Sequence, residues 1–276
     1  MWVTVMNNGL VRTACALVMA CVFSTLPTRG AIIFQDDFAS GPSSLWANES
    51  GAWIGFSGSY YATAPNNNPC AFSSLPFDLK AFSVDFDINS VSDGGIFLRA
   101  QPAPGTTLGI QGILLNFKVP GGGPRLYWHV FYGTNGSAPL NLTYLDFGAT
   151  PHVHVEVIGD TYAAYINGST EPATTLTTNG FSTGRVALYD FSGQSFSNFV
   201  LGRIQPTLSI RMDPDAAVLY WSDAFPDYLL QTSDDLSGQW FTLGGPYALG
   251  DGMYQVRLPL LNLLHKQFFR LKYNGL

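Results

Sequence analysis

The sequence predicts an all-β protein, and its composition supplies the main reasons. Of the 276 residues, 46% are hydrophobic and 14% aromatic, which is enough apolar material for a packed core and excludes intrinsic disorder. The 29 Gly and 17 Pro residues suit short strands joined by tight turns. Acidic residues outnumber Lys and Arg by 19 to 13, a formal net charge of −6, which argues against a nucleic-acid partner.

Residues 1–30 have the architecture of a signal peptide. They contain Arg12 and Arg29 but no acidic residue, and the apolar stretch 14–23 is too short to stay in a membrane as a transmembrane segment. We therefore expect cleavage near 28–31 and a secreted, periplasmic or cell-surface protein. In a second interpretation, Cys21 ends an imperfect lipobox and carries a lipid anchor.

The region 31–205 is expected to be a β-sandwich of short antiparallel strands. Turns are marked by residues that tolerate a positive φ, as at Gly159-Asp160 and Asn167-Gly168. Between the turns, apolar and polar residues alternate or form short apolar runs at 82–88, 95–100, 110–118, 125–132, 152–158, 162–166, 185–191 and 196–201.

A smaller, separate β-sandwich is expected from 206 to 276. Pro206 interrupts the chain, and the turns Asp213-Pro214-Asp215 and Gly250-Asp251-Gly252 divide the C-terminal segment. Short alternating runs lie between them, at 208–212, 218–221, 228–232, 240–243, 254–258 and 268–272. The predicted organisation is thus a signal peptide (1–30), a larger β-domain (31–205) and a small β-domain (206–276).

Several segments resemble a concanavalin A-like jelly roll of the laminin-G (LamG) and glucanase superfamily. They are FSVDFDI at 82–88, DGGIFLRA at 93–100, HVHVEVIGDTYAAYINGS at 152–169 and FSTGRVALYDFSGQSFSNFVL at 181–201. The second is also similar to an element of the 3-keto-disaccharide hydrolase domain (DUF1080). The segment 206–276 resembles the small immunoglobulin-like or fibronectin III-like modules of secreted bacterial proteins. The resemblance implies a jelly-roll sandwich followed by such a module, a fold shared by lectins, hydrolases and adhesion proteins.

Catalytic motifs are sparse. The sequence contains no nucleophile elbow, P-loop, dinucleotide fingerprint or HExxH motif. The glucanase relatives carry a Glu-containing ExDxxE strand, where this chain offers only Asp85 and Asp87 on one strand face. A family-16-like or 3-keto-disaccharide hydrolase-like hydrolase or lyase that uses Asp85 or Asp87 is one alternative. The simpler interpretation pairs both carboxylates with Arg99 on the next strand.

The leading hypothesis is an exported, non-catalytic module that binds a glycan or polysaccharide. Sugars stack on aromatic rings while charged and amide groups bind their hydroxyls. We expect one sheet face to be lined by Asp85, Asp87, Arg99, Gln111, Trp128 and His129. Exposed stacking rings are expected among Trp46, Tyr60, Tyr61, Trp128 and Tyr132. A structural cell-envelope protein without a small ligand is a third interpretation.

No required cofactor is expected. His152 and His154 share a strand face, but without a visible third zinc ligand they are interpreted as a surface pair. A structural calcium ion would suit an extracellular jelly roll, and its candidate ligands near the first and last strands are Asp36, Asp37, Asp190 and Asn198. The sequence predicts neither the sugar nor the oligomeric state.

Overall fold

The computed structural model describes residues 3–6, 30–119, 121, 123–260 and 266–274. The expected apolar stretch 14–23, the candidate lipidation residue Cys21 and the cleavage region up to residue 29 lie outside the described residues. The described residues contain only strands and connecting segments, and no helix capable of crossing a membrane is found among them. The chain forms two compact units, Arg29–Ile204 and Met1–Thr28 with Gln205–Leu276.

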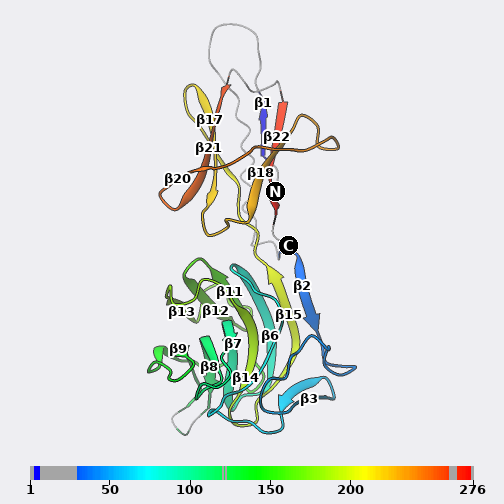
Figure 1. Ribbon diagram of the computed structural model, residues 1–276, viewed down its shortest axis with the longest axis vertical. Helices are drawn as coiled ribbons and strands as arrows, with labels where there is room; N and C mark the ends of the chain where they lie inside the picture. Colours follow the sequence, from blue (N-terminus) through cyan, green and yellow to red (C-terminus); the bar gives the residue numbers. More distant parts are fainter. Residues whose placement is uncertain (1–2, 7–29, 120, 122, 261–265, 275–276) are drawn as a thin grey trace. The chain divides into compact units, whose positions relative to one another are not determined.

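The larger unit contains two antiparallel sheets (Figure 1). The six-stranded sheet has the order β10-β9-β8-β7-β14-β5. Its strands are β5 (Ala71–Ser74), β7 (Asp93–Pro102), β8 (Ile110–Lys118), β9 (Arg125–Tyr132), β10 (Leu140–Tyr144) and β14 (Arg185–Asp190). Three of the strands expected from the sequence, at 110–118, 125–132 and 185–191, are thereby confirmed as neighbours or near neighbours in one sheet.

The eight-stranded sheet has the order β13-β12-β11-β6-β15-β4-β3, with β2 also paired to β15. Its strands are β2 (Ile32–Asp36), β3 (Trp53–Phe56), β4 (Ser59–Ala62), β6 (Phe82–Ser90), β11 (His152–Ile158), β12 (Thr161–Ile166), β13 (Thr174–Thr177) and β15 (Ser195–Arg203). Asn167 and Gly168, directly after β12, have φ values of 54° and 75°, as expected for a turn at this position. The predicted all-β sandwich is confirmed.

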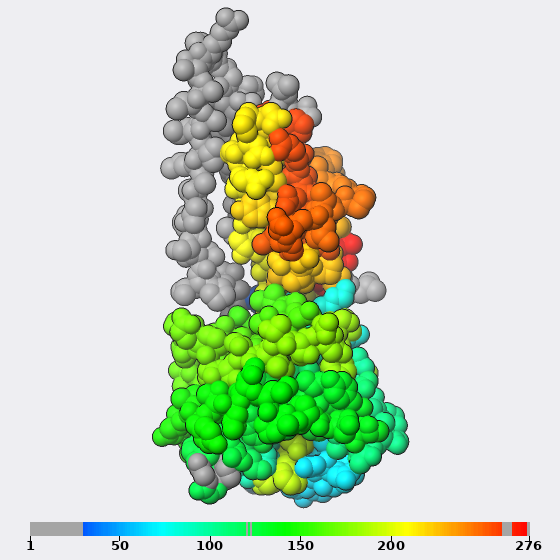
Figure 2. All heavy atoms as spheres, turned by 90° about the vertical axis from the view of Figure 1, so that its left-hand side faces the viewer, coloured from blue at the N-terminus to red at the C-terminus, as the bar shows by residue number. Residues whose placement is uncertain are grey.

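The two sheets pack against each other through alternate side chains. Phe86 of β6 and Leu115 of β8 are fully buried members of the same core cluster. A second apolar cluster lies on the opposite side of the six-stranded sheet and includes Phe97, Leu114 and Tyr189. Because both faces of the central strand β7 meet apolar side chains, its first eight residues are all buried. Figure 2 shows the larger unit from the side where the green segments, which include β9 to β12, form the visible face.

Arg99 ties the end of β7 to loops that belong to the other sheet. Arg99 is only 2% exposed, and its guanidinium donates to the carbonyl oxygens of Lys80 (2.7 Å), Gly159 (2.6 Å) and Phe181 (2.7 Å). It also donates to the Tyr162 hydroxyl at 3.2 Å. The cation is thus stabilised largely by backbone dipoles, which replace the water it loses on burial.

The expectation that Arg99 shares an open face with Asp85 and Asp87 is wrong. The two Asp residues lie on β6 and Arg99 on β7, and these consecutive strands belong to different sheets. In addition, the β7–β8 register shifts between Leu98 and Gln101, and Arg99 has a φ of 49°. This bulge breaks the simple alternation from which an outward-facing Arg99 was expected.

The smaller unit has two four-stranded sheets, ordered β1-β22-β18-β19 and β16-β17-β21-β20. Its core includes Leu219, Trp221, Leu230 and Phe269. Trp240 lies outside this core: it is half-buried and packs against the Arg270 guanidinium at 4.1 Å. The strands are β1 (Val3–Met6), β16 (Ser209–Met212), β17 (Ala216–Ser222), β18 (Tyr228–Ser233), β19 (Phe241–Thr242), β20 (Ala248–Gly250), β21 (Met253–Pro259) and β22 (Lys266–Tyr273).

Replacing Arg99 tests its role in holding the sandwich. Arg99→Met is expected to lower the free energy of unfolding by about 3 kcal/mol or more, because three buried carbonyl oxygens lose their donor. Urea denaturation followed by tryptophan fluorescence measures the loss. The control Arg185→Met, at a half-buried arginine on β14, should change stability by less than about 1 kcal/mol. Equal effects of the two substitutions would contradict the role assigned to Arg99.

Candidate functional site

The residues expected to line one face are distributed over several parts of the larger unit. Trp128 is fully buried, and its Nε1 donates to Thr174 Oγ1 at 3.1 Å inside the core. It therefore has no surface on which a sugar could stack. Gln111 lies at the start of β8 and donates to Gln101 at 2.7 Å. Because it is two residues before the core residue Ile113, its side chain is on the inner side of the strand and not on the outer face.

The aromatic rings expected to be exposed are also divided. Trp46 and Tyr60 are 6% and 1% exposed and belong to the core, so these two candidates have no surface on which a sugar could stack. Tyr132 is 57% exposed and Tyr61 is half-buried. The outer faces of the two sheets carry different groups of side chains: contacting aromatic rings on one, and paired carboxylates and imidazoles on the other.

The outer face of the six-stranded sheet carries a continuous row of rings, here called the aromatic strip. Along β9, Leu126, Trp128 and Val130 enter the core, so the intervening residues face outward. Centroid distances between successive rings along the strip are 5.1, 5.7, 5.2 and 5.5 Å, and each pair meets nearly edge to face. In order, the strip consists of Tyr127, His129, Phe131, Phe97 and Tyr189.

A polar network borders the aromatic strip. Asn116 Nδ2 donates to Asp93 Oδ1 at 3.0 Å and to the Tyr127 hydroxyl at 2.8 Å. Asp93 also forms an ion pair with Lys118. Asn116 is 3% exposed, and its Oδ1 has no hydrogen-bond partner among the described residues. The network thus fixes amide, carboxylate, ammonium and phenol groups beside the rings.

Burial determines the protonation states of the titratable rings in the aromatic strip. Burial lowers the pKa of His129, and it outweighs the Ser137 carbonyl and the Asp93 charge, which both favour the cation. Because the carbonyl of Ser137 can only accept, the 2.8 Å contact assigns the proton to His129 Nδ1 and leaves Nε2 as an acceptor in the neutral ring. Burial raises the pKa of Tyr127 and Tyr189, which therefore keep their hydroxyl protons at neutral pH.

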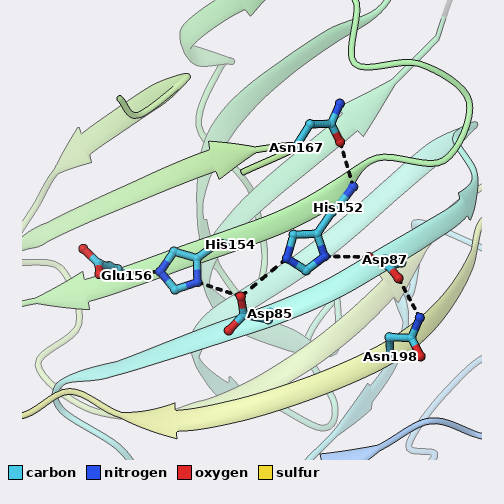
Figure 3. Close-up of polar contacts among 7 residues, drawn as sticks. All are labelled: Asp85, Asp87, His152, His154, Glu156, Asn167 and Asn198. Atoms are coloured by element: carbon cyan, nitrogen blue, oxygen red, sulfur yellow. Dashed lines mark hydrogen bonds and ion pairs between the residues drawn. The ribbon is translucent and has the colours of Figure 1, made fainter. Parts of the chain in front are cut away.

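The outer face of the eight-stranded sheet carries a group of five side chains from β6 and β11, here called the acid–histidine cluster (Figure 3). The strand register places His152 opposite Asp87 and His154 opposite Asp85. The cluster consists of Asp85, Asp87, His152, His154 and Glu156. The interpretation that both Asp residues pair with Arg99 is therefore wrong, because their partners are histidines.

Carboxylates and imidazoles alternate along the cluster. Asp87 Oδ1 lies 2.6 Å from His152 Nδ1, and His152 Nε2 lies 3.6 Å from Asp85 Oδ1. The same Asp85 oxygen is 2.9 Å from His154 Nδ1, while His154 Nε2 is 3.5 Å from Glu156 Oε1. Burial would lower the pKa of His154, but hydrogen bonds and charge from Asp85 and Glu156 outweigh it and raise the pKa to about 9.

The candidate calcium ligands do not converge on one point. Asp36 accepts from the backbone amides of Phe38 and Ser43, and Asp37 accepts from that of Ala39. Asp190, on the other sheet, accepts from the backbone amides of residues 192–194.

Asn198, the remaining candidate, donates to Asp87 at 2.7 Å. Across the described part of the chain, no group of three or more His, Cys, Asp or Glu side chains is arranged to hold a metal ion. The structural calcium ion stays a prediction.

Comparisons with known proteins find similarity in structure only. No protein-family model matches the chain, and no curated protein matches it in sequence. A carbohydrate-binding module, CBM66 from Bacillus subtilis, is 16% identical with a TM-score of 0.47 over 57% of this chain and 95% of its own. A Bacillus subtilis protein of unknown function with a galectin-like fold is 11% identical with a TM-score of 0.48, over 64% and 97%. A Bacillus licheniformis β-glucanase is 12% identical with a TM-score of 0.44, over 62% and 98%.

One member of the aromatic strip, His129, is among the ligand-binding residues predicted from the sequence. The other β9 rings expected to contact a sugar are Trp128 and Tyr132, whereas the outward-facing rings of the strand are at 127, 129 and 131. The sequence signal for the outward-facing rings was the apolar series Leu126, Trp128 and Val130. Because these three side chains form the core, the alternate residues 127, 129 and 131 must face outward.

Two substitutions on β9 test whether Trp128 faces the core and His129 faces outward. Trp128→Ala is expected to lower the free energy of unfolding by about 3–5 kcal/mol, because it empties a fully buried core position. His129→Ala, at the next residue but on the outer face, should cost less than about 1.5 kcal/mol. Urea denaturation of both variants measures the difference. A His129 variant as destabilised as the Trp128 variant would contradict the assignment of faces.

Proposed function

We propose that this protein binds carbohydrate through the aromatic strip. The observation that carries the proposal is that the partly exposed rings of His129 and Phe131, held in a row of otherwise buried rings, lie on the same sheet face as the Asp93–Asn116–Lys118 network. A sugar offers flat C–H surfaces and a ring of hydroxyls, so its recognition needs aromatic area beside fixed polar groups. An export signal at 1–30, as the sequence predicts, would bring such a face to extracellular or periplasmic glycans.

His129 and Phe131 are the residues best placed to contact a sugar. Both are half-buried, so part of each ring stays open to solvent while its neighbours hold it in position. Neutral His129 offers an acceptor at Nε2, and the partly exposed Lys118 ammonium offers donors. Because neighbouring rings already restrict these side chains, little rotamer freedom is lost when a ligand binds.

The aromatic strip supports carbohydrate binding without hydrolysis. Glycoside hydrolysis requires two carboxylates on either side of the scissile bond. Asp93 is the carboxylate of the polar network, and it is paired with Lys118 and Asn116. Asp85 and Asp87, the expected acid/base candidates, lie on the other sheet. A polysaccharide incubated with the protein should therefore release no reducing ends.

Phe131→Ala tests the strip directly. Binding to soluble polysaccharides such as β-glucan, xylan, galactan and fructan is measured by affinity electrophoresis, followed by calorimetry on any ligand found. We expect the substitution to weaken binding at least tenfold, about 1.4 kcal/mol, because a partly exposed stacking ring is lost.

The matched control is Phe56→Ala, which removes a 71% exposed ring from β3 of the eight-stranded sheet. It should leave the affinity unchanged. Loss of binding in the Phe56 variant but not in the Phe131 variant would refute the proposal. Absence of binding to every polysaccharide would instead favour a structural envelope protein, and release of reducing ends a hydrolase.

A further inference from the structure

The acid–histidine cluster lies on the sheet opposite the aromatic strip, so its role is independent of the proposed function. It joins two strands that are distant in sequence, β6 and β11, through side chains that are partly exposed to solvent. The side chain of Asp85 is 8% exposed, that of His154 28% and that of His152 42%. Protons from solvent can therefore reach the imidazoles while Asp85 stays largely shielded.

The charges that face each imidazole come from several strands. His154 is faced by Asp85 from β6, by Glu156 from its own strand and by the phenol of Tyr165 from β12, whose ring centroid is 5.6 Å away. Tyr165 also donates to Glu156 at 3.5 Å.

His152 is faced by two carboxylates of β6, those of Asp85 and Asp87. Asn198 of β15 donates to the second carboxylate, and Asn167 beyond β12 accepts from the His152 backbone amide at 3.0 Å. A positive charge on His154 offsets part of the negative charge of the three carboxylates. When His154 is neutral, the carboxylates repel one another more strongly.

We propose that the acid–histidine cluster is a proton-operated clamp on the outer face of the eight-stranded sheet. Protonated His154 bridges Asp85 of one strand and Glu156 of the other through charge-assisted hydrogen bonds. Loss of one proton removes one of the two N–H donors of His154 together with its positive charge, so the imidazole can donate to only one of the two carboxylates and the face becomes more negative. The backbone pairing of β6 with β11 persists in both states.

The direction of the pH dependence is set by the raised pKa of His154. Its ordinary pKa is 6.5 in an unfolded chain and about 9 in the folded protein. A group whose pKa rises on folding stabilises the fold below its unfolded pKa, and that contribution disappears as the pH rises through its folded pKa. The clamp is therefore closed at pH 6.5 and open above about pH 9.

Proton NMR titration of the full chain tests the clamp, with the resonances assigned through His152→Gln and His154→Gln. His154 should titrate near pH 9, well above His129, whose pKa burial lowers. Asp85→Asn should shift the His154 midpoint down by at least one pH unit. Asp87→Asn is the matched control, because its carboxylate contacts His152. It should shift the His154 midpoint by much less.

Urea unfolding at pH 6.5 and pH 9.5 provides an independent measurement. The urea midpoint of the wild type should fall between these two pH values by more than that of His154→Gln, which has no proton to lose. A wild-type His154 midpoint at or below pH 6.5, or one that Asp85→Asn leaves in place, would overturn the clamp. The wild-type titration decides the matter even where a variant fails to fold.

Discussion

The larger sandwich depends on one buried cation. Arg99 leaves the six-stranded sheet at the β7 bulge and reaches loops at the end of the eight-stranded sheet, where three backbone carbonyls and the Tyr162 hydroxyl surround it. Burying a guanidinium without such partners would cost more free energy than a fold of this size can spare. The interaction therefore fixes how the ends of β6, β11 and β13 lie against β7. Arg99, which the sequence suggested as an exposed ligand-binding cation, is thus a buried residue that holds the two sheets together.

The outer faces of the two sheets, turned away from the shared core, differ in chemistry. On β9, the core takes Leu126, Trp128 and Val130, so the alternate rings form the aromatic strip. On β6 and β11, the core takes Val84, Phe86 and Val155, so Asp85, His154 and their neighbours form the acid–histidine cluster. The first face offers apolar rings beside fixed polar groups, which suits a sugar. The second offers titratable groups that neutralise one another, which suits a response to protons.

The sequence was sufficient for the fold class and for most strands of the larger unit, because alternation and turn residues are local signals. The strands at 110–118, 125–132 and 152–158 have the expected bounds. The sites were harder for physical reasons. Trp128 and its neighbour His129 were placed on one face of β9, although adjacent side chains in a strand point to opposite faces. Arg99 was misplaced because a bulge interrupts its strand, and the pairing of Asp85 with His154 depends on the order β11-β6, which no local pattern encodes.

The central claim is that carbohydrate binds to the outer face of the six-stranded sheet. The most direct test is an NMR titration of the isotope-labelled protein with a polysaccharide fragment that it retains, followed through backbone amides. Chemical-shift changes are expected to concentrate on β7, β8 and β9 around Asn116, His129 and Phe131, while β6 and β11 stay unchanged. Changes that concentrate around Asp85 and His154 and leave β9 unaffected would contradict it.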